Sequence, residues 1–177
     1  MKKIEIRRHA LNDSGLREGM LSPEGIKQAR GVGAEQMRGQ GYTHIAVSEL
    51  FRTSQTAAAM AEGAGDFTAS SLVVLPALFT KRLDELAAYI KEHGSVVKPD
   101  HPVIKKESLR MAEEFAAHVE NLPQDANLLA IGHSPLIEIM VYGLTGKIIA
   151  PLKECEKFEL NDTQFKRGLV FDGDLPI

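Results

Sequence analysis

The sequence predicts an α/β fold in which a mostly parallel central sheet is covered by helices on both faces, a three-layer α/β/α sandwich. Short apolar runs typical of buried strands alternate along the chain with longer segments whose apolar residues follow helical spacing. The runs at 72–75 and 128–131 are apolar throughout, as in parallel strands that are buried on both faces. With 177 residues and 44% hydrophobic content, the chain can build a core, and we expect one domain over residues 1–177.

The elements can be assigned in order along the chain. A first strand is expected at residues 3–7, followed by a loop at 10–19. Ser22 and Pro23 are typical of a helix start, and this helix is expected to reach about residue 40, next to two glycines. The remaining expected elements are strands at 44–47, 72–75 and 128–131, helices at 50–63, 78–92, 104–121 and 136–144, and a terminal hairpin of 156–160 with 168–171.

Composition excludes several classes of partner. A net charge of -3 argues against non-specific nucleic-acid binding. The single Cys155 cannot form an internal disulfide, which suits a reducing compartment. No apolar run is long enough for a membrane span, and the charged N-terminus does not resemble a signal peptide. We therefore expect a cytoplasmic protein without membrane or nucleic-acid partners; its oligomeric state stays open.

The most informative residues are Arg8 and His9. They follow an apolar run that contains Ile4 and Ile6, and they open a loop of small and polar residues. Neutral imidazole is a competent nucleophile at physiological pH, and a guanidinium binds phosphoryl oxygens through two parallel hydrogen bonds. A histidine beside an arginine at the end of a first strand therefore indicates attack on a phosphoryl group.

Two further segments place chargeable side chains at strand ends. Arg52 follows the run at 44–47 and falls in the first turns of the next helix, where backbone N–H groups and the helix dipole favour an anion. His133 follows the apolar run at 128–131 and precedes an apolar helix. Because the carboxyl ends of parallel strands meet at one edge of a sheet, we expect both side chains to share a pocket with His9.

Four motifs, in order, resemble those of the histidine phosphatase superfamily, whose fold is phosphoglycerate mutase-like. Arg8-His9-Ala10 resembles the family's Arg-His-Gly start, with alanine in place of glycine, and Gly132-His133 resembles its late Gly-His pair. The stretch 21–29 is similar to Leu-Thr-x-x-Gly-x-x-Gln-Ala, and 48–57 to Ser-x-Leu-x-Arg-x-x-x-Thr-Ala. The resemblance covers nearly the whole chain, which in its shortness is similar to the small phosphohistidine phosphatases of bacteria.

The resemblance implies a role for each matching residue. His9 would be the nucleophile that takes the phosphoryl group, and Arg8 and Arg52 would bind its oxygens. His133 would complete the pocket as an imidazolium that donates to the phosphoryl group and stabilises developing charge. Asn12, on the loop after His9, is a further candidate for phosphate binding. The resemblance implies neither a metal nor a cofactor.

The family's general acid is missing from its usual place. Many members carry a glutamate in a Leu-x-Glu-x-x-x-Gly setting, but the stretch 75–83 contains none. Another arrangement puts aspartate directly after the late histidine, where this chain has Ser134. Asp84 and Glu85, one helical turn further on, are possible acids or else belong to a solvated helix face. Glu138, in an otherwise apolar helix, either orients a pocket group or is a structural carboxylate.

The missing acid bears on the expected substrate. An alkoxide leaving group needs protonation by the enzyme, whereas the imidazole of a phosphohistidine is a better leaving group that water can protonate. We therefore expect a phosphatase with a phosphohistidine intermediate at His9, acting on phosphohistidine in proteins. The alternatives are a phosphomonoesterase or mutase of small phosphorylated metabolites, and an inert module that binds phosphate or phosphopeptides.

Overall fold

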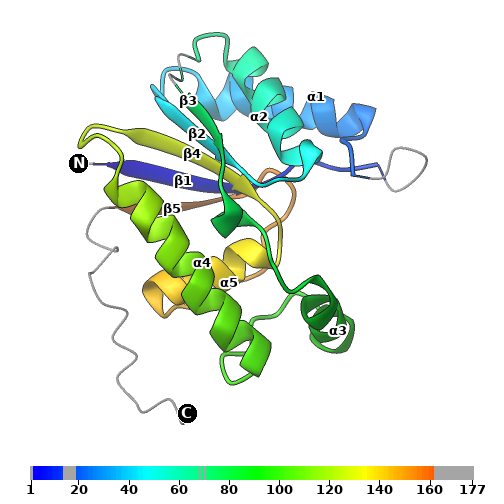
Figure 1. Cartoon of the computed structure of the whole chain (residues 1–177). Coiled ribbons are helices and arrows are strands. Elements are labelled where there is room, and N and C mark those ends of the chain that lie inside the picture. Colours follow the sequence, from blue (N-terminus) through cyan, green and yellow to red (C-terminus); the bar gives the residue numbers. More distant parts are fainter. Residues whose placement is uncertain (1, 14–18, 68, 70, 162–177) are drawn as a thin grey trace.

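The computed structural model describes residues 2–13, 19–67, 69 and 71–161. The described residues form a five-stranded sheet in the order β3-β2-β4-β1-β5, and Figure 1 shows it at the centre of the molecule. Neighbouring strands from β3 to β1 are parallel, while β5 runs antiparallel to β1 at one edge. The expected mostly parallel sheet is confirmed. Its strands are β1 Lys3–Arg8, β2 His44–Val47, β3 Ser71–Val74, β4 Asn127–Gly132 and β5 Lys157–Asn161.

Helices cover both faces of the sheet, as the three-layer prediction requires. In Figure 1, α1 (Pro23–Val32) and α2 (Phe51–Ala64) lie above the sheet. On the other side lie α4 (Pro102–Glu120) and α5 (Leu136–Thr145), with α3 (Leu83–His93) beside them. Among the described residues, no helix combines the length and apolarity needed to cross a bilayer.

The strands alternate their side chains between two cores. Ile4 and Ile6 of β1 belong to the core under α4 and α5, together with Leu128 of β4. Ile45 of β2 and Leu129 of β4 belong to the core under α1 and α2. This two-sided burial explains the continuous apolar run of β4 from Leu128 to Ile131, whereas β1 buries Glu5 and Arg7 on its other face.

Two predicted helices were wrong at one end. The helix expected from Pro23 to residue 40 ends at Val32 and continues as a π-helical turn, Gly33–Met37. Gly33 lies so close to α2 that a Cβ atom there would fall 2.0 Å from the Met60 carbonyl oxygen. At this point the backbone of Gly33 contacts the backbone of α2. The π-helical turn therefore coincides with close packing against α2, which the amphipathic pattern of the sequence does not predict.

The second error concerns the helix expected at 78–92. A 3-10 turn, Pro76–Leu78, comes first, and α3 begins only at Leu83. Between them, side chains replace helical hydrogen bonds: the Thr80 hydroxyl accepts from Arg82 N (2.9 Å), and Arg110 donates to the Phe79 carbonyl (2.6 Å). The preceding strand also starts and ends one residue earlier than expected.

The predicted terminal hairpin is described only in its first half. β5 pairs along its length with β1, from Lys3 opposite Asn161 to Arg7 opposite Lys157. Residues 168–171, its expected partner, lie outside the described part of the chain.

Candidate functional site

Strand register brings His9 and His133 together. Arg8 pairs with Gly132 in the parallel β1–β4 ladder, so the next residue of each strand lies at the same edge of the sheet. The His9 backbone N–H donates to the Gly132 carbonyl (3.0 Å), and the two imidazole rings have their centroids 5.0 Å apart. The site therefore lies at the carboxyl ends of the parallel strands, where open α/β sheets bind ligands.

His9 is oriented as a nucleophile. Its Nδ1 lies 2.6 Å from the Ala10 carbonyl oxygen, which can only accept, so Nδ1 carries the proton and Nε2 keeps a lone pair. Nε2 accepts from Nε of Arg52 at 3.2 Å. Burial, together with the Arg52 and Arg8 guanidiniums and despite the bond to Ala10, lowers the pKa of His9 to about 4. The ring is consequently neutral and nucleophilic at physiological pH.

Two guanidiniums flank His9. Arg52 is the second residue of α2, and burial and the neighbouring Arg8 lower its pKa below the usual value. Arg8 donates from one terminal nitrogen to the Leu152 carbonyl (2.7 Å) and from the other to the Glu154 carboxylate (2.8 Å). Arg8 Nε is buried and has no partner within the described ranges. The pair supplies positive charge next to the nucleophile.

His133 presents one bonded and one free ring nitrogen. Its Nε2 lies 2.6 Å from the Ser48 hydroxyl, whereas Nδ1 is buried without a partner among the described residues. The Phe79 ring packs edge-on against the imidazole, with centroids 5.7 Å apart. Burial lowers the pKa of His133 to about 2, and the nearby charges of Arg52, His9 and Arg8 act in the same direction. In the free protein, burial therefore favours the neutral ring over the imidazolium that the resemblance implies.

The loop after His9 is anchored to the first helical layer. The Ala10 N–H donates to the Thr56 hydroxyl of α2 (3.1 Å), and the Leu11 N–H donates to the Gln28 side chain of α1 (3.1 Å). Asn12 forms an isolated antiparallel bridge with Leu21, and its side-chain amide donates to the Asp13 carbonyl at 3.4 Å. Asn12 thus lies on this loop but makes no hydrogen bond to the four pocket residues.

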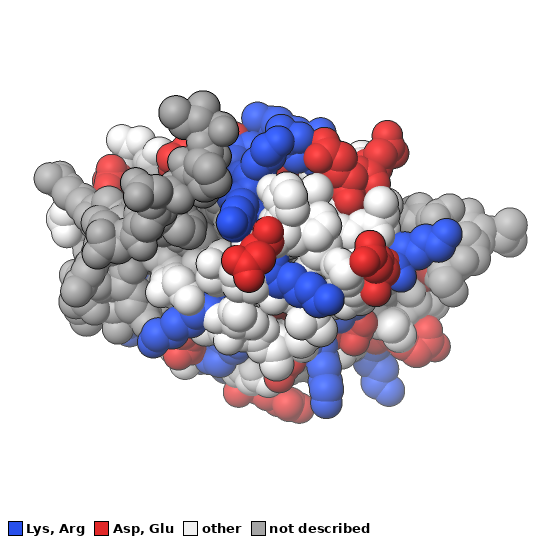
Figure 2. All heavy atoms as spheres, turned by 90° about the horizontal axis from the view of Figure 1, so that it is seen from below, with Lys and Arg blue, Asp and Glu red and all other residues white. Residues whose placement is uncertain are grey.

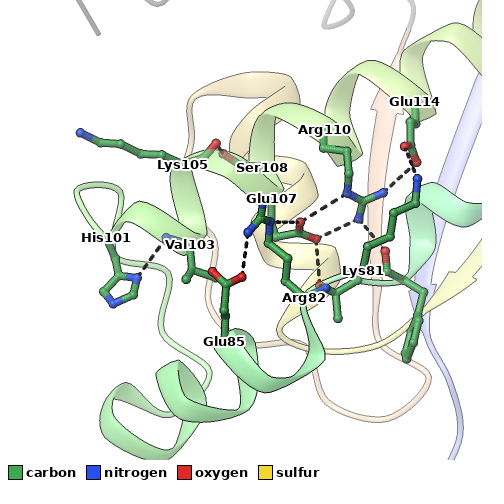
Figure 3. Close-up of polar contacts among 12 residues, drawn as sticks. Lys81, Arg82, Glu85, His101, Val103, Lys105, Glu107, Ser108, Arg110 and Glu114 are labelled. Carbon is green, nitrogen blue, oxygen red and sulfur yellow. Dashed lines mark hydrogen bonds and ion pairs between the residues drawn. The ribbon is translucent and has the colours of Figure 1, made fainter. Parts of the chain in front are cut away.

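A buried ion-pair network fixes the wall beside His133. Figure 3 shows Glu107 of α4 between Arg82 and Arg110, and its carboxylate accepts from Arg110 (2.9 Å) and from Thr80 (2.9 Å). The same Arg110 donates to the carbonyl of Phe79, the residue whose ring contacts His133. The network therefore holds the turn at 79–82 in place without contacting the phosphoryl site itself.

Residues 8–93 match the model of the histidine phosphatase superfamily, branch 1. The matched segment contains Arg8, His9 and Arg52, so nearly half of the chain, with three of the four pocket residues, is similar to this superfamily. Comparison of the sequence with curated proteins gives no match.

Solved structures show that the shared fold extends over nearly the whole chain. A mycobacterial glucosyl-3-phosphoglycerate phosphatase superposes with a TM-score of 0.65 at 15% identity, covering 91% of this chain and 90% of that one. The alpha-ribazole phosphatase from Shigella flexneri gives a TM-score of 0.64 at 16% identity, with 92% of each chain covered. The phosphoserine phosphatase from Entamoeba histolytica gives 0.56 at 22% identity, covering 81% and 80%. The expected phosphoglycerate mutase-like fold is confirmed.

The two possible acids do not join the pocket residues. Asp84 and Glu85 are exposed in the first turn of α3, and Glu85 pairs with Arg82 at 2.7 Å, as Figure 3 shows. Within the described ranges, neither carboxylate has a hydrogen bond or ion pair to His9 or His133. The ion pair with Arg82 keeps the Glu85 carboxylate beside the Glu107 network, between α3 and α4.

Two other carboxylates approach the pocket. Glu154, which the sequence analysis does not single out, pairs with Arg8. Glu138 is fully buried, and its Oε1 accepts from the Ser134 hydroxyl (2.7 Å) and from Leu152 N (2.6 Å). The carbonyl of the same Leu152 accepts a hydrogen bond from Arg8. Glu138 therefore links the turn after His133 to the loop that binds Arg8. For Glu138, these contacts favour a role in orienting the pocket over that of a purely structural carboxylate.

The remaining reactive groups have other surroundings. Cys155 is buried beside β1, and burial raises the pKa of its thiol to about 11, which makes it a poor nucleophile. The described residues contain no group of three or more His, Cys, Asp or Glu side chains placed to hold a metal ion.

On the face in Figure 2, basic side chains gather at the upper edge with acidic ones directly beside them.

Proposed function

We propose that this chain is a phosphatase in which His9 takes a phosphoryl group from the substrate and water then removes it. The observation that carries this proposal is the orientation of His9: Nδ1 donates to the Ala10 carbonyl, and the unprotonated Nε2 accepts from Arg52 Nε at 3.2 Å. A residue that only bound phosphate would not need an unprotonated nitrogen held among guanidiniums.

The chemistry has two steps. Nε2 attacks phosphorus, a P–N bond forms, and the bond to the leaving group breaks; the leaving group keeps the electron pair and takes a proton from water. Arg8 and Arg52 bind the phosphoryl oxygens while negative charge is redistributed. Water then attacks phosphorus, the P–N bond breaks, and neutral His9 and inorganic phosphate are regenerated. Throughout, the Ala10 carbonyl holds the proton on Nδ1.

The proposed substrate is phosphohistidine in a protein. The two carboxylates linked to Arg8 and to the turn after His133 have partners there: Glu154 is paired with Arg8, and Oε1 of the buried Glu138 accepts two hydrogen bonds. Ala77, within the segment where relatives carry their glutamate, has no ionisable group. An imidazole leaving group needs less help from an enzyme acid than an alkoxide does. These features support a phosphoramidate substrate.

Hydrolysis assays test both parts of the proposal. Wild type and His9→Ala are compared on p-nitrophenyl phosphate and on a phosphohistidine peptide. We expect activity that disappears with His9 and a higher kcat/KM on the peptide. If His9→Ala retains the activity of the wild type, His9 is not the nucleophile. Inertness on both substrates, with retained binding of inorganic phosphate, would instead indicate the binding module.

A second candidate is hydrolysis of small phosphorylated metabolites. It is favoured by the similar structures, which include phosphatases named for glucosyl-3-phosphoglycerate, alpha-ribazole phosphate and phosphoserine. Those three compounds form the comparison panel. A much higher kcat/KM on any of them than on the phosphohistidine peptide would replace the protein substrate with a metabolite.

A further inference from the structure

The two ring nitrogens of His133 are in different situations. Nε2 lies 2.6 Å from the Ser48 hydroxyl, whereas Nδ1 is buried without a partner in the described part of the chain. A neutral imidazole carries one proton, so only one nitrogen can donate. The position of that proton decides whether Nδ1 offers a phosphoryl oxygen a donor or a lone pair.

The hydrogen bonds around Ser48 restrict the choice. The Leu50 N–H donates to Ser48 Oγ at 3.2 Å. Thr53 Oγ1 lies 2.8 Å from the Leu50 carbonyl oxygen and 3.1 Å from that of Ser48. Because carbonyl oxygens only accept, the Thr53 hydroxyl donates to one of them and can only accept from Ser48.

The Ser48 proton therefore has two possible acceptors. His133 Nε2 lies at 2.6 Å and Thr53 Oγ1 at 3.2 Å, so the shorter contact is to the imidazole. If Ser48 donates to Nε2, the single ring proton resides on Nδ1. That N–H is then a buried donor with no acceptor among the described residues, and a ligand oxygen could supply one.

We propose that Ser48 is a positioning residue that holds His133 in the tautomer protonated on Nδ1, so that this N–H donates to the phosphoryl group in transfer. The inference rests on the proposed phosphatase function. A hydrogen bond to one imidazole nitrogen sets the tautomer, and the other nitrogen then has a fixed role. With the opposite tautomer, a nitrogen lone pair would face the phosphoryl oxygens and repel them.

Nitrogen-15 NMR of protein labelled at histidine tests the proposal directly. The His133 signals are identified by their loss in His133→Asn. In the wild type we expect a protonated Nδ1 and an unprotonated Nε2, a measurement that needs no variant of Ser48. Ser48→Ala should move the ring proton toward Nε2. A wild-type ring protonated on Nε2, or a tautomer unchanged in Ser48→Ala, would overturn the assignment.

Thr53→Val is the matched control. It is close to threonine in shape and removes the competing acceptor of the Ser48 proton, but it leaves the Ser48–His133 contact in place. The Nδ1–H tautomer should persist in this variant. If the wild-type ring is protonated on Nε2 and Thr53→Val moves the proton toward Nδ1, the Ser48 proton belongs to Thr53 in the wild type and the proposal fails.

Kinetics supply the functional readout. Ser48→Ala should lower kcat on p-nitrophenyl phosphate by about 10- to 100-fold with a smaller change in KM, because the lost donor acts mainly on the transition state. Thr53→Val should keep most of the activity, and equal losses in both variants would count against the proposal. The NMR result does not depend on turnover. An inert wild type with Nδ1–H would contradict the proposed function alone, and an active enzyme with Nε2–H would contradict the tautomer alone.

Discussion

His9 and His133 lie side by side, and both are neutral for the same reason. Each is buried, and each faces the guanidiniums of Arg8 and Arg52, so a positive charge on either ring is unfavourable. A neutral His9 is what nucleophilic attack requires. The charge that binds a phosphoryl group is left to the two arginines.

The pH dependence of kcat/KM reports the state of His9. Its pKa of about 4 is lowered from 6.5, so the neutral form persists well below neutral pH. On a substrate that does not itself titrate in this range, we expect kcat/KM to fall only as the pH approaches about 4. The measurement is a pH series of initial rates. An acid limb near pH 6.5 would mean that His9 is not desolvated as the structure has it.

Arg52→Lys tests the guanidinium beside the nucleophile. Lysine keeps the charge but loses the planar fork that binds two phosphoryl oxygens, and its ammonium cannot reproduce the contact of Arg52 Nε with His9. We expect kcat/KM on p-nitrophenyl phosphate to fall by about 100-fold. Arg30→Lys, in an exposed pair with Glu62, is the control and should leave activity unchanged. Equal activity of the Arg52 variant and the wild type would remove Arg52 from the site.

At this scale, the sequence predicted the residues better than their states. The structure brings together Arg8, His9, Arg52 and His133, and the sequence indicates them because each lies at or just after a strand end or in the first turn of a helix. The pairing of Arg8 with Glu154 could not, since it depends on how the loop before β5 folds back onto β1. The neutral state of His133 also depends on burial, which the chain order does not show.

At the scale of elements, α1 supports the loop that follows His9. A Cβ atom on Gly25 would fall 1.9 Å from the Leu11 carbonyl oxygen, so the helix and this loop are in backbone contact. The same carbonyl accepts from Ser22 N (3.0 Å) at the start of the helix. The loop position therefore depends on a glycine at residue 25.

Gly25→Ala should displace this loop. We expect a loss of about 1–3 kcal/mol in the free energy of unfolding, as for other overpacked sites, and a clear drop in kcat. Gly31→Ala is a matched control in the same helix, because a Cβ there meets no atom within 4 Å; it should be neutral or stabilise by up to about 1 kcal/mol. Denaturant unfolding and initial rates measure both. Similar behaviour of the two variants would contradict the contact.

Element prediction succeeded where local pattern decides and failed where side chains from distant elements intervene. The strand at 44–47 matches β2 residue for residue. The helix expected from residue 78 starts late, because Arg110 of α4 takes the Phe79 carbonyl and Thr80 bonds to Glu107. Nothing in the local sequence at 78–82 carries that information.

For the whole molecule, the two buried histidines couple folding to pH. In the unfolded chain each takes up a proton near pH 6.5, whereas in the folded protein His9 does so only near 4 and His133 near 2. The unfolded state therefore binds more protons as the pH falls below 6.5, and stability is lost in that direction. The alternating pattern of strands and helices predicts the layers, but not this linkage.

The expected size of the effect follows from the shifts. Between pH 7 and pH 5, each histidine should cost the folded state about 2 kcal/mol. Denaturant unfolding at several pH values measures the slope, and His133→Asn should remove about half of the contribution of the pair. A free energy of unfolding that stays constant from pH 7 to pH 5 would show that these rings are solvated.

Trapping the phosphorylated enzyme tests the central claim most directly. The wild type is mixed with a phosphohistidine peptide, quenched within the first turnover in alkali, where phosphohistidine survives, and measured by intact-protein mass spectrometry with fragmentation. The account predicts a gain of one phosphoryl group located on His9 and none in His9→Ala. A phosphoryl group on another residue, or rapid turnover without any phosphorylated protein, would contradict it.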